Sequence, residues 1–458
     1  MGTTLFIAEK RDMAISIAKA LSPSNDMKKG FIVGKNNMIF TWAIGHLLEL
    51  DPSEKPSEKW SLETLPIIPK MFNLKPIPNK SSQLQIIKKL ATDANVIINA
   101  CDAGREGELI FYYIAKYLNL TKRPIKRLWT SSLQPSGIQT TYKKLKDWNE
   151  FEGLRVAAIT RSRSDWIIGI NATRAFTAKS GTLLKIGRVV TPTLALIYKR
   201  HMERETFKKE PYFPITATFK QGNATYIGKW QGDMIKERQL SEKIKSEILN
   251  QNGEIIEMEE KNEYEPVPLL FNLTDLTNLA NQRFGFKAKQ TLKLAQSLYE
   301  THKCITYPRT SNRYITENEV PLMLKSHQAL KGQFTQYVKN GMNPSLVHTR
   351  NKRICNPAKV DDHHALLPEP VIPSNLSTDE EKIYHLILER FFMQFYSAAQ
   401  YQSLTIHTNC AGHLFLSKYK NLIEEGWRTI SEKEDKHDSN ELKWTPSSRQ
   451  LFYKFKVH

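Results

Sequence analysis

The first 120 residues alternate between short apolar runs and stretches of helical spacing. Residues 4–8 and 95–100 are runs of apolar and small residues, which is typical of strands buried on both faces. Helical spacing follows each run, and residues 31–42 indicate a hairpin around residues 34–37. Strands that alternate with helices predict a mostly parallel α/β sheet. Residues 51–80 are rich in Pro, Ser and Lys and indicate a long surface connection.

Strand and helix patterns are mixed in the rest of the chain. Alternating apolar positions over residues 212–230 and a run over residues 253–258 predict strands. Residues 270–299 and 386–395 have the spacing of helices, and strands are expected again within residues 403–417. The chain has 458 residues, more than a single core usually supports, so we expect three or four domains.

Charge narrows the class of partner. Lys and Arg number 66 against 47 Asp and Glu, a net charge of +19, which favours a polyanion such as nucleic acid, although a merely soluble basic protein stays open. The four cysteines have no C-x-x-C spacing, which argues against a disulfide framework and a zinc ribbon. No apolar run approaches the ~20 residues of a membrane span, and no signal-peptide pattern is present, so a soluble cytoplasmic protein is the default expectation.

Acidic residues follow both predicted buried strands. Glu9 comes directly after the first strand, and Asp102 and Glu106 come after the second. Ligands bind at the carboxyl edge of an open α/β sheet, where these three carboxylates could converge on magnesium. The alternative is that Asp102, Glu106 and Glu108 form a solvated helix start that the helix dipole favours.

A tyrosine within residues 305–310 (ITYPRT) is a candidate nucleophile. Pro308 favours an extended conformation at Tyr307, and Arg309 projects from the same short segment. A phenol can attack a phosphodiester if its proton is removed, and a guanidinium matches phosphate oxygens. A tyrosine that only packs or turns the chain is the alternative.

A basic stretch with aromatic residues precedes that tyrosine. Its cations are Arg161, Arg163, Arg174, Lys185 and Arg188, interleaved with Trp166 and Phe176. This composition suits a nucleic-acid backbone with stacked bases, whereas a solvated helix face is the alternative for Arg161 or Arg163. Residues 361–364 (DDHH) suggest a metal site, but adjacent residues on one helix do not share a face, which argues against fourfold ligation.

Several of these motifs together resemble the type IA DNA topoisomerases, most closely the bacterial topoisomerase III branch. Residues 102–109 (DAGREGEL), with residues 6–10 (FIAEK) upstream, are similar to that family's Toprim domain. Residues 164–175 and 187–193 resemble its helical region, and residues 301–310 resemble its active-site tyrosine motif. The resemblance runs from about residue 4 to about residue 430.

The resemblance implies roles for individual side chains. Tyr307 would be the nucleophile, Lys10 and Arg309 would stabilise charge on the phosphoryl group, and His363 would donate a hydrogen bond or shuttle a proton. The implied catalytic set is Tyr307, Arg309, Lys10, Glu9 and His363. The implied ligands for Mg²⁺ are Glu9, Asp102 and Glu106. The expected DNA-binding residues are Arg188, Arg174, Arg163, Lys185 and His46.

Two positions depart from the family pattern. Gly104 stands where the family usually has a second aspartate of its metal motif, so we expect Glu106, together with Glu108, to contribute more, and one or two metal ions stay open. Val190 stands where the family usually has glutamine, whereas Arg188 is retained.

The implied fold is multidomain α/β and α+β: a Toprim α/β domain with the helical and β-rich domains of the type IA topoisomerase toroid. We expect the toroid to be incomplete, because family members continue beyond about residue 430. The expected ranges are 1–150 for the Toprim domain, 151–211 for a partial helical domain, 212–265 for the first pass of a β-rich hinge domain, 266–400 for the tyrosine domain and 401–458 for a truncated return of the hinge.

The implied function is ATP-independent breakage of one DNA strand through a 5′-phosphotyrosine, passage of a strand and rejoining. DNA, chiefly single-stranded, is the expected partner, a helicase partner is left open, and no membrane is expected. Two other classes remain. One is a truncated DNA-binding protein with little or no strand passage, and the other is a Toprim nuclease or primase, which would not need Tyr307.

Overall fold

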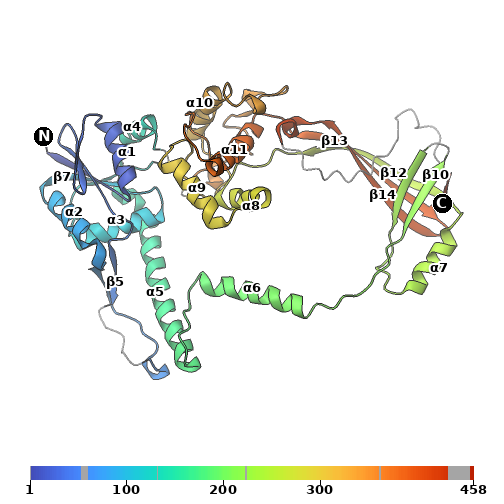
Figure 1. The fold of residues 1–458 in the computed structure, drawn as a ribbon, viewed down its shortest axis with the longest axis horizontal. Helices are drawn as coiled ribbons and strands as arrows, with labels where there is room; N and C mark the ends of the chain where they lie inside the picture. The colour runs from blue at the N-terminus through green and yellow to red at the C-terminus, as the bar shows by residue number, and fades with distance from the viewer. Residues whose placement is uncertain are drawn as a thin grey trace. The chain divides into compact units, whose positions relative to one another are not determined.

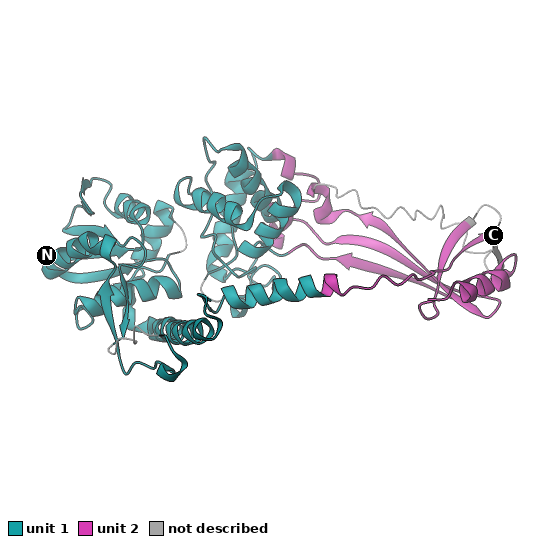
Figure 2. Ribbon diagram, turned by 60° about the horizontal axis from the view of Figure 1, so that its bottom comes forward, with its two compact units in different colours: residues 1–202, 269–334, 347–391 teal, residues 203–268, 335–346, 392–458 magenta. Residues whose placement is uncertain are grey.

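The computed structural model of the chain describes residues 2–52, 60–130, 133–221, 224–360, 363–431 and 454–457. These residues divide into two compact units (Figure 2). Unit 1 comprises residues 1–202, 269–334 and 347–391, and unit 2 comprises residues 203–268, 335–346 and 392–458. The five domain ranges expected from the sequence stay predictions.

A seven-stranded sheet lies in unit 1. Its strands in spatial order are β2 (Asp26–Lys28), β3 (Phe31–Val33), β4 (Met38–Trp42), β1 (Thr3–Ala8), β7 (Ala94–Ala100), β8 (Ile125–Arg127) and β9 (Lys146–Asp147). The pairs β4–β1, β1–β7 and β7–β8 are parallel, and the outer pairs are antiparallel. The predicted α/β sheet and the hairpin over residues 31–42 are therefore confirmed.

Helices cover both faces of this sheet (Figure 1). Helices α1 (Arg11–Leu21) and α4 (Pro135–Tyr142) lie on one face, and α2 (Ser81–Asp93) and α3 (Arg105–Tyr117) lie on the other. Alternate residues of β1 face the two helix layers. Leu5 and Ile7 pack in the core beneath α2 and α3. Phe6 lies on the other face, where its ring centroid is 4.6 Å from that of Phe40 and its ring contacts Tyr142 of α4. This two-sided burial is why β1 is apolar at every position from Leu5 to Ala8.

Part of the predicted surface connection over residues 51–80 is instead a second, two-stranded sheet. Strand β5 (Leu48–Pro52) pairs antiparallel with β6 (Phe72–Pro76). Leu50 and Leu74 are register partners and pack on the core beneath α2 and α3, which explains why this stretch is ordered despite its polar composition. Residues 53–59 of the expected connection lie outside the described residues.

The remaining elements of unit 1 are helical. Helices α5 (Glu152–Ser180) and α6 (Val190–Glu205) follow the sheet, and α6 has no buried residue. The tyrosine segment lies among α8 (Leu273–Phe284), α9 (Ala288–Glu300), α10 (Val320–Leu330) and α11 (Thr378–Met393). Its short 3-10 helices are η1 (Leu62–Thr64), η2 (Pro78–Lys80), η3 (Trp148–Phe151), η4 (Glu317–Glu319) and η7 (Pro357–Lys359); η5 (Thr335–Tyr337), η6 (Pro344–Leu346) and η8 (Gly426–Ile430) belong to unit 2. Among the described helices, none is long and apolar enough to cross a membrane.

Unit 2 is built on a closed β-barrel, with α7 (Arg238–Ile248) beside it. The barrel order is β10 (Thr216–Gln221), β11 (Ala224–Trp230), β14 (His413–Glu424), β13 (Ala399–Cys410), β12 (Asn252–Glu265) and β15 (Lys454–Val457). Phe219 and Phe415 are fully buried at its centre. The strand predictions within residues 212–230, 253–258 and 403–417 are confirmed, although β12, β13 and β14 are longer than expected.

A fully buried ion pair fixes the carboxyl end of β7. Arg127 Nε lies 2.6 Å from Glu108 Oε1, and both side chains have no exposed area. Asn99 and the Trp148 indole donate to the two oxygens of Glu108, at 2.9 and 3.0 Å. The Arg127 guanidinium also donates to the carbonyl oxygens of Cys101 and Asp102, at 2.7 Å each. Strands β7 and β8 and helix α3 are therefore locked together beside Asp102.

We expect Arg127→Met to lower the free energy of unfolding by about 3–5 kcal/mol, because it leaves the Glu108 charge buried without its partner. The double variant Arg127→Met with Glu108→Gln removes that charge and should recover part of the loss. Urea unfolding followed by circular dichroism measures both variants. A double variant as unstable as the single one would contradict this account of the ion pair.

Candidate active site

Parallel pairing of the two central strands sets the position of the first carboxylates. Ala8 of β1 is the register partner of Ala100 of β7. Both strands end at the same edge of the sheet, so Glu9 and Asp102 leave it side by side and interact electrostatically. Helix α3 begins against this edge, and a Cβ at Gly107 would lie 2.1 Å from the Asp102 carbonyl oxygen. Only glycine permits this close approach.

The two carboxylates repel each other, and the neighbouring cations offset this only in part. Glu9 Oε2 is buried and has no hydrogen-bond partner among the described residues. Burial and the charge of Asp102 raise the pKa of Glu9 to about 7. Burial also raises the pKa of Asp102, although Lys10 and Arg127 oppose that shift. A cation bound between these groups would relieve their repulsion.

Tyr307 meets this edge from a separate part of the chain. Its segment is held in extended form, because the Thr306 N–H donates to the Leu367 carbonyl at 2.9 Å and the Leu367 N–H donates to Thr306 Oγ1 at 3.0 Å. The Tyr307 side chain reaches the Asp102 carboxylate, and the two groups interact. Burial, followed by the charges of Asp102 and Glu9, raises the pKa of Tyr307, so the phenol is protonated in this arrangement.

Two cations accompany the phenol. Lys10 Nζ lies 2.9 Å from Glu300 Oε1 and 3.7 Å from Asp102 Oδ2. Burial lowers the pKa of Lys10, but Asp102, Glu300 and Glu9 more than offset this and raise it above its usual value. Arg309 is exposed and donates from NH2 to Gln296 Oε1 at 3.1 Å.

His363 packs beside Tyr307. Its ring centroid lies 4.5 Å from that of Tyr307, and its carbonyl oxygen accepts from Asn312 Nδ2 at 2.7 Å. His363 Nδ1 is buried without a hydrogen-bond partner among the described residues, and burial lowers the pKa of the ring to about 4. A Cβ at Gly104 would lie 3.3 Å from His363 Nε2, so the glycine faces this ring. Asp361 and Asp362 lie outside the described residues, and the suggested metal site over residues 361–364 is untested.

Glu106 is turned toward other partners. Its Oε1 lies 2.6 Å from His46 Nε2, and its Oε2 accepts from Arg161 NH2 at 2.9 Å. The hydrogen bond from His46 lowers the pKa of Glu106, and Arg161 adds to the shift. Within the described ranges, no group of three or more His, Cys, Asp or Glu side chains is arranged to hold a metal ion. The structure thus brings Glu9 and Asp102 together. Glu106 interacts with Glu9 but has its two oxygens paired with His46 and Arg161, and its part in metal binding stays a prediction.

The expectation that Glu108 shares the metal ligation is wrong in this structure. Its side chain is fully buried, and Arg127, Asn99 and Trp148 use its two oxygens. A carboxylate with these partners and no exposed area is held away from the site. Its role is to hold β7, β8 and α3 together.

The expected DNA-binding residues have different surroundings. Arg188 makes a two-pronged contact with Asp165, at 2.6 and 3.2 Å, and Lys185 is exposed. Arg163 lies over the ring of Phe72. Arg174 is only 6% exposed and lies over Trp60, so a DNA strand could reach it only after that packing opens. The fifth residue, His46, is the partner of Glu106.

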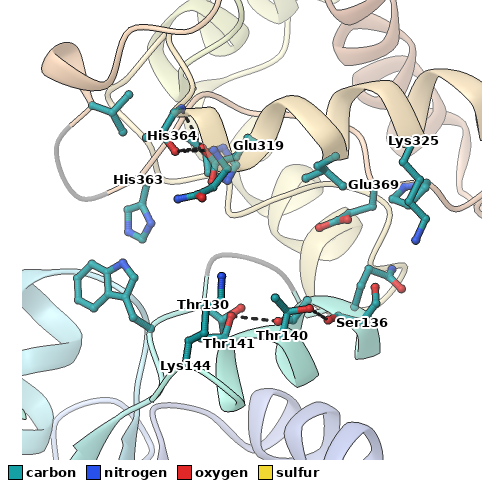
Figure 3. A pocket seen from close by; sticks show the side chains of 18 of the residues that line it. Thr130, Ser136, Thr140, Thr141, Lys144, Glu319, Lys325, His363, His364 and Glu369 are labelled. Carbon is teal, nitrogen blue, oxygen red and sulfur yellow. Dashed lines mark hydrogen bonds between the residues drawn. The ribbon is translucent and has the colours of Figure 1, made fainter. Parts of the chain in front are cut away.

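A cavity of about 700 Å³ adjoins His363 (Figure 3). Thr140 and Lys144 line one wall, and Lys325, His364 and Glu369 line the other. No sequence pattern indicated this cavity. Also missed were Arg127, Gln296 and Glu300; the last two have the i, i+4 spacing of a helix pair directly before the tyrosine motif, which was the only available signal.

We expect His363 to remain neutral at pH 6 and to titrate near 4, because protonation would bury a charge. Its pKa in the folded protein is lower than its ordinary value of 6.5, so the unfolded chain takes up a proton that the folded chain does not. His363 thus leaves stability intact above about pH 6.5 and lowers it as the pH falls toward 4. Nitrogen-15 NMR of the parent and a His363→Gln variant assigns this resonance. Titration of His363 between pH 6 and 7 would contradict the expected burial.

Two family models match successive parts of the chain. The Toprim domain model matches residues 4–133, and the DNA topoisomerase model matches residues 149–452. DNA topoisomerase 3 of Bacillus subtilis (strain 168) is 36% identical over 454 residues, which covers 96% of this chain and 61% of that protein. DNA topoisomerase 3 of Staphylococcus epidermidis is 38% identical, covering 99% of this chain and 63% of the relative. The chain therefore spans less than two thirds of the length of these two relatives.

Two further comparisons cover a larger share of the matched protein. DNA topoisomerase 3 of Haemophilus influenzae is 35% identical over 471 residues, which covers 95% of this chain and 72% of that protein. Full-length topoisomerase I from Thermotoga maritima has a similar fold, with a TM-score of 0.68 at 19% identity over 99% of this chain and 70% of that chain. The resemblance inferred from the motifs is confirmed: the chain belongs to the type IA DNA topoisomerase family and has the topoisomerase 3 proteins among its relatives.

Proposed function

We propose that this chain is a type I DNA topoisomerase that breaks one DNA strand through a covalent bond to Tyr307, allows a strand to pass and rejoins the break without ATP. The observation that carries the proposal is the convergence of Tyr307 and Asp102, whose side chains interact, with Lys10 3.7 Å from the same carboxylate. A nucleophile, a proton acceptor and a cation thus share one site. The net charge of +19 supports DNA as the substrate, chiefly in single-stranded segments.

The cleavage step follows from these groups. The Tyr307 oxygen attacks the phosphorus, its proton passes to the Asp102 carboxylate, and the bond from phosphorus to the 3′ oxygen breaks. Glu9, with a pKa of about 7, is partly protonated at neutral pH and can give its proton to the departing 3′ oxygen. Lys10 and Arg309 stabilise the negative charge that builds up on the phosphoryl oxygens. Rejoining is the reverse, with the phosphotyrosine bond conserving the energy of the phosphodiester.

His363 contributes a neutral ring. With its pKa lowered to about 4, it can donate or accept a hydrogen bond at the phosphate but adds no charge near neutral pH. Its contact with the Tyr307 ring also limits the rotation of the nucleophile. We therefore assign it to orientation and hydrogen bonding.

Glu9 and Asp102 fit Mg²⁺, the ion that Toprim domains usually bind. Glu9 Oε2 lacks a hydrogen-bond partner among the described residues. The negative charges of Glu9 and Asp102 repel each other, and a divalent cation would neutralise them. Glu106 could join them only by leaving His46 and Arg161, and Gly104 supplies no ligand. When bound, the ion would supply positive charge for holding the phosphates of the strand.

Tyr307→Phe should abolish the covalent adduct with a labelled single-stranded oligonucleotide, because the variant lacks the attacking oxygen, while single-strand affinity stays within about twofold of the parent. Denaturing electrophoresis after incubation with Mg²⁺ measures the adduct, and fluorescence anisotropy measures affinity. The matched control is Tyr198→Phe, at an exposed tyrosine on α6. An adduct formed by Tyr307→Phe would refute the assignment and leave a Toprim nuclease or primase as the better reading.

Asp102→Asn should weaken divalent-cation binding by at least about tenfold, because one of two adjacent anionic ligands is lost. Electron paramagnetic resonance of Mn²⁺, used as a probe for the Mg²⁺ site, measures the free ion directly and does not depend on catalysis. Glu106→Gln should have a smaller effect, since Glu106 pairs with His46 and Arg161. Parent-like Mn²⁺ affinity in Asp102→Asn would show that the ion binds elsewhere.

A further inference from the structure

One glutamate links the two cations of the candidate site. Glu300 is the last residue of α9, and Gln296 lies one turn before it. Glu300 Oε1 accepts from Lys10 Nζ at 2.9 Å and from Gln296 Nε2 at 3.0 Å. Gln296 Oε1 in turn accepts from Arg309 NH2 at 3.1 Å. The network thus runs from the end of β1 to the tyrosine segment.

The polarity of this network is fixed. Lys10 and Arg309 can only donate, so Gln296 must present its oxygen to Arg309 and its nitrogen to Glu300. Only Glu300 accepts at the other end. Its carboxylate is therefore the acceptor that links the two cations, directly for Lys10, which also interacts with Asp102, and through one amide for Arg309.

Both cations keep further hydrogen-bond donors outside the network. The Lys10 ammonium has three donors and directs one to Glu300, with Asp102 3.7 Å away. Arg309 has five donors, is exposed, and gives one of them to Gln296. Both side chains are held in place with donors still free for a phosphate. This argues for alignment rather than for competition with DNA.

We propose that Glu300 is a positioning residue for strand cleavage, which aligns Lys10 directly and Arg309 through Gln296 before the scissile phosphate arrives. The proposal rests on the proposed function, because it concerns the same phosphate. Ordering long cationic side chains costs conformational entropy, and the network meets this cost in the free protein. Glu300 itself need not touch the DNA.

Cleavage kinetics separate this role from a structural one. Glu300→Ala should slow single-turnover cleavage of a saturating oligonucleotide by about tenfold, the effect of losing one charge-assisted hydrogen bond, while the Kd for the oligonucleotide changes less than about twofold. Glu300→Gln keeps the acceptor oxygen without its charge and should be intermediate. Glu381→Ala, at an exposed glutamate on α11, is the control and should match the parent. Faster cleavage by Glu300→Ala would make the glutamate a competitor of the phosphate and overturn the proposal.

A double-mutant cycle tests the route of the effect. In a Lys10→Ala background, Glu300→Ala should slow cleavage much less than it does in the parent, because its direct partner is already gone. Gln296→Leu should slow cleavage only by the share of the Glu300→Ala effect that Arg309 mediates. Fully additive effects of Lys10→Ala and Glu300→Ala would mean that Glu300 does not act through Lys10, which also overturns the proposal.

The network can be examined without catalysis. Acylation of lysine amines followed by peptide mass spectrometry should label Lys10 faster in Glu300→Ala than in the parent or in Glu381→Ala, because the ammonium has lost its 2.9 Å partner. Equal labelling in all three proteins would overturn the proposed alignment. If the parent protein forms no adduct but Lys10 is still labelled faster in Glu300→Ala, the proposed function is refuted and the network stands as described.

Discussion

The buried ion pair between Arg127 and Glu108 is the constraint on which the site depends. It joins the short strand β8 to the first turn of α3, and the same guanidinium holds the carbonyl oxygen of Asp102. Gly107 then lets α3 approach that carbonyl more closely than any other residue would allow. The position of Asp102 is thus set by the side chains of Arg127 and Glu108, which have no access to solvent.

From that fixed point the chemistry of the site follows. Parallel pairing of β1 with β7 adds Glu9 and Lys10, and the extended tyrosine segment adds a phenol that interacts with Asp102. Burial and like charge keep Glu9 and Tyr307 protonated more readily than in water. The arrangement therefore favours the protonated forms of Glu9 and Tyr307 beside the cations Lys10 and Arg309.

Patterns of local spacing predicted much of this arrangement. The runs that form β1 and β7 were apolar because both of their faces are covered, and the carboxyl-edge rule then brought Glu9 and Asp102 together. Strand periodicity also located the strands of the barrel in unit 2. In contrast, β5 and β6 were hidden by polar composition, since their order comes from pairing with each other and from packing on the core.

Local patterns could not predict which side chains far apart in the sequence would contact one another. Glu106 looked like a metal ligand, but its nearest groups are His46 and Arg161, which lie far away in sequence. Glu108 looked exposed at a helix start and is fully buried. Arg127 and Glu300 have no distinctive motif, because their importance arises only when β8 and α9 reach the edge where β1 and β7 end.

The central claim, that Tyr307 is the residue that carries the broken strand, is tested most directly by locating the covalent bond itself. The parent protein is trapped with a single-stranded oligonucleotide, and the adduct is digested with protease and nuclease. Tandem mass spectrometry then identifies the modified peptide. The account predicts a nucleotide attached through its 5′ phosphate to the Tyr307 oxygen. A nucleotide on any other side chain, or one attached through a 3′ phosphate, would contradict it.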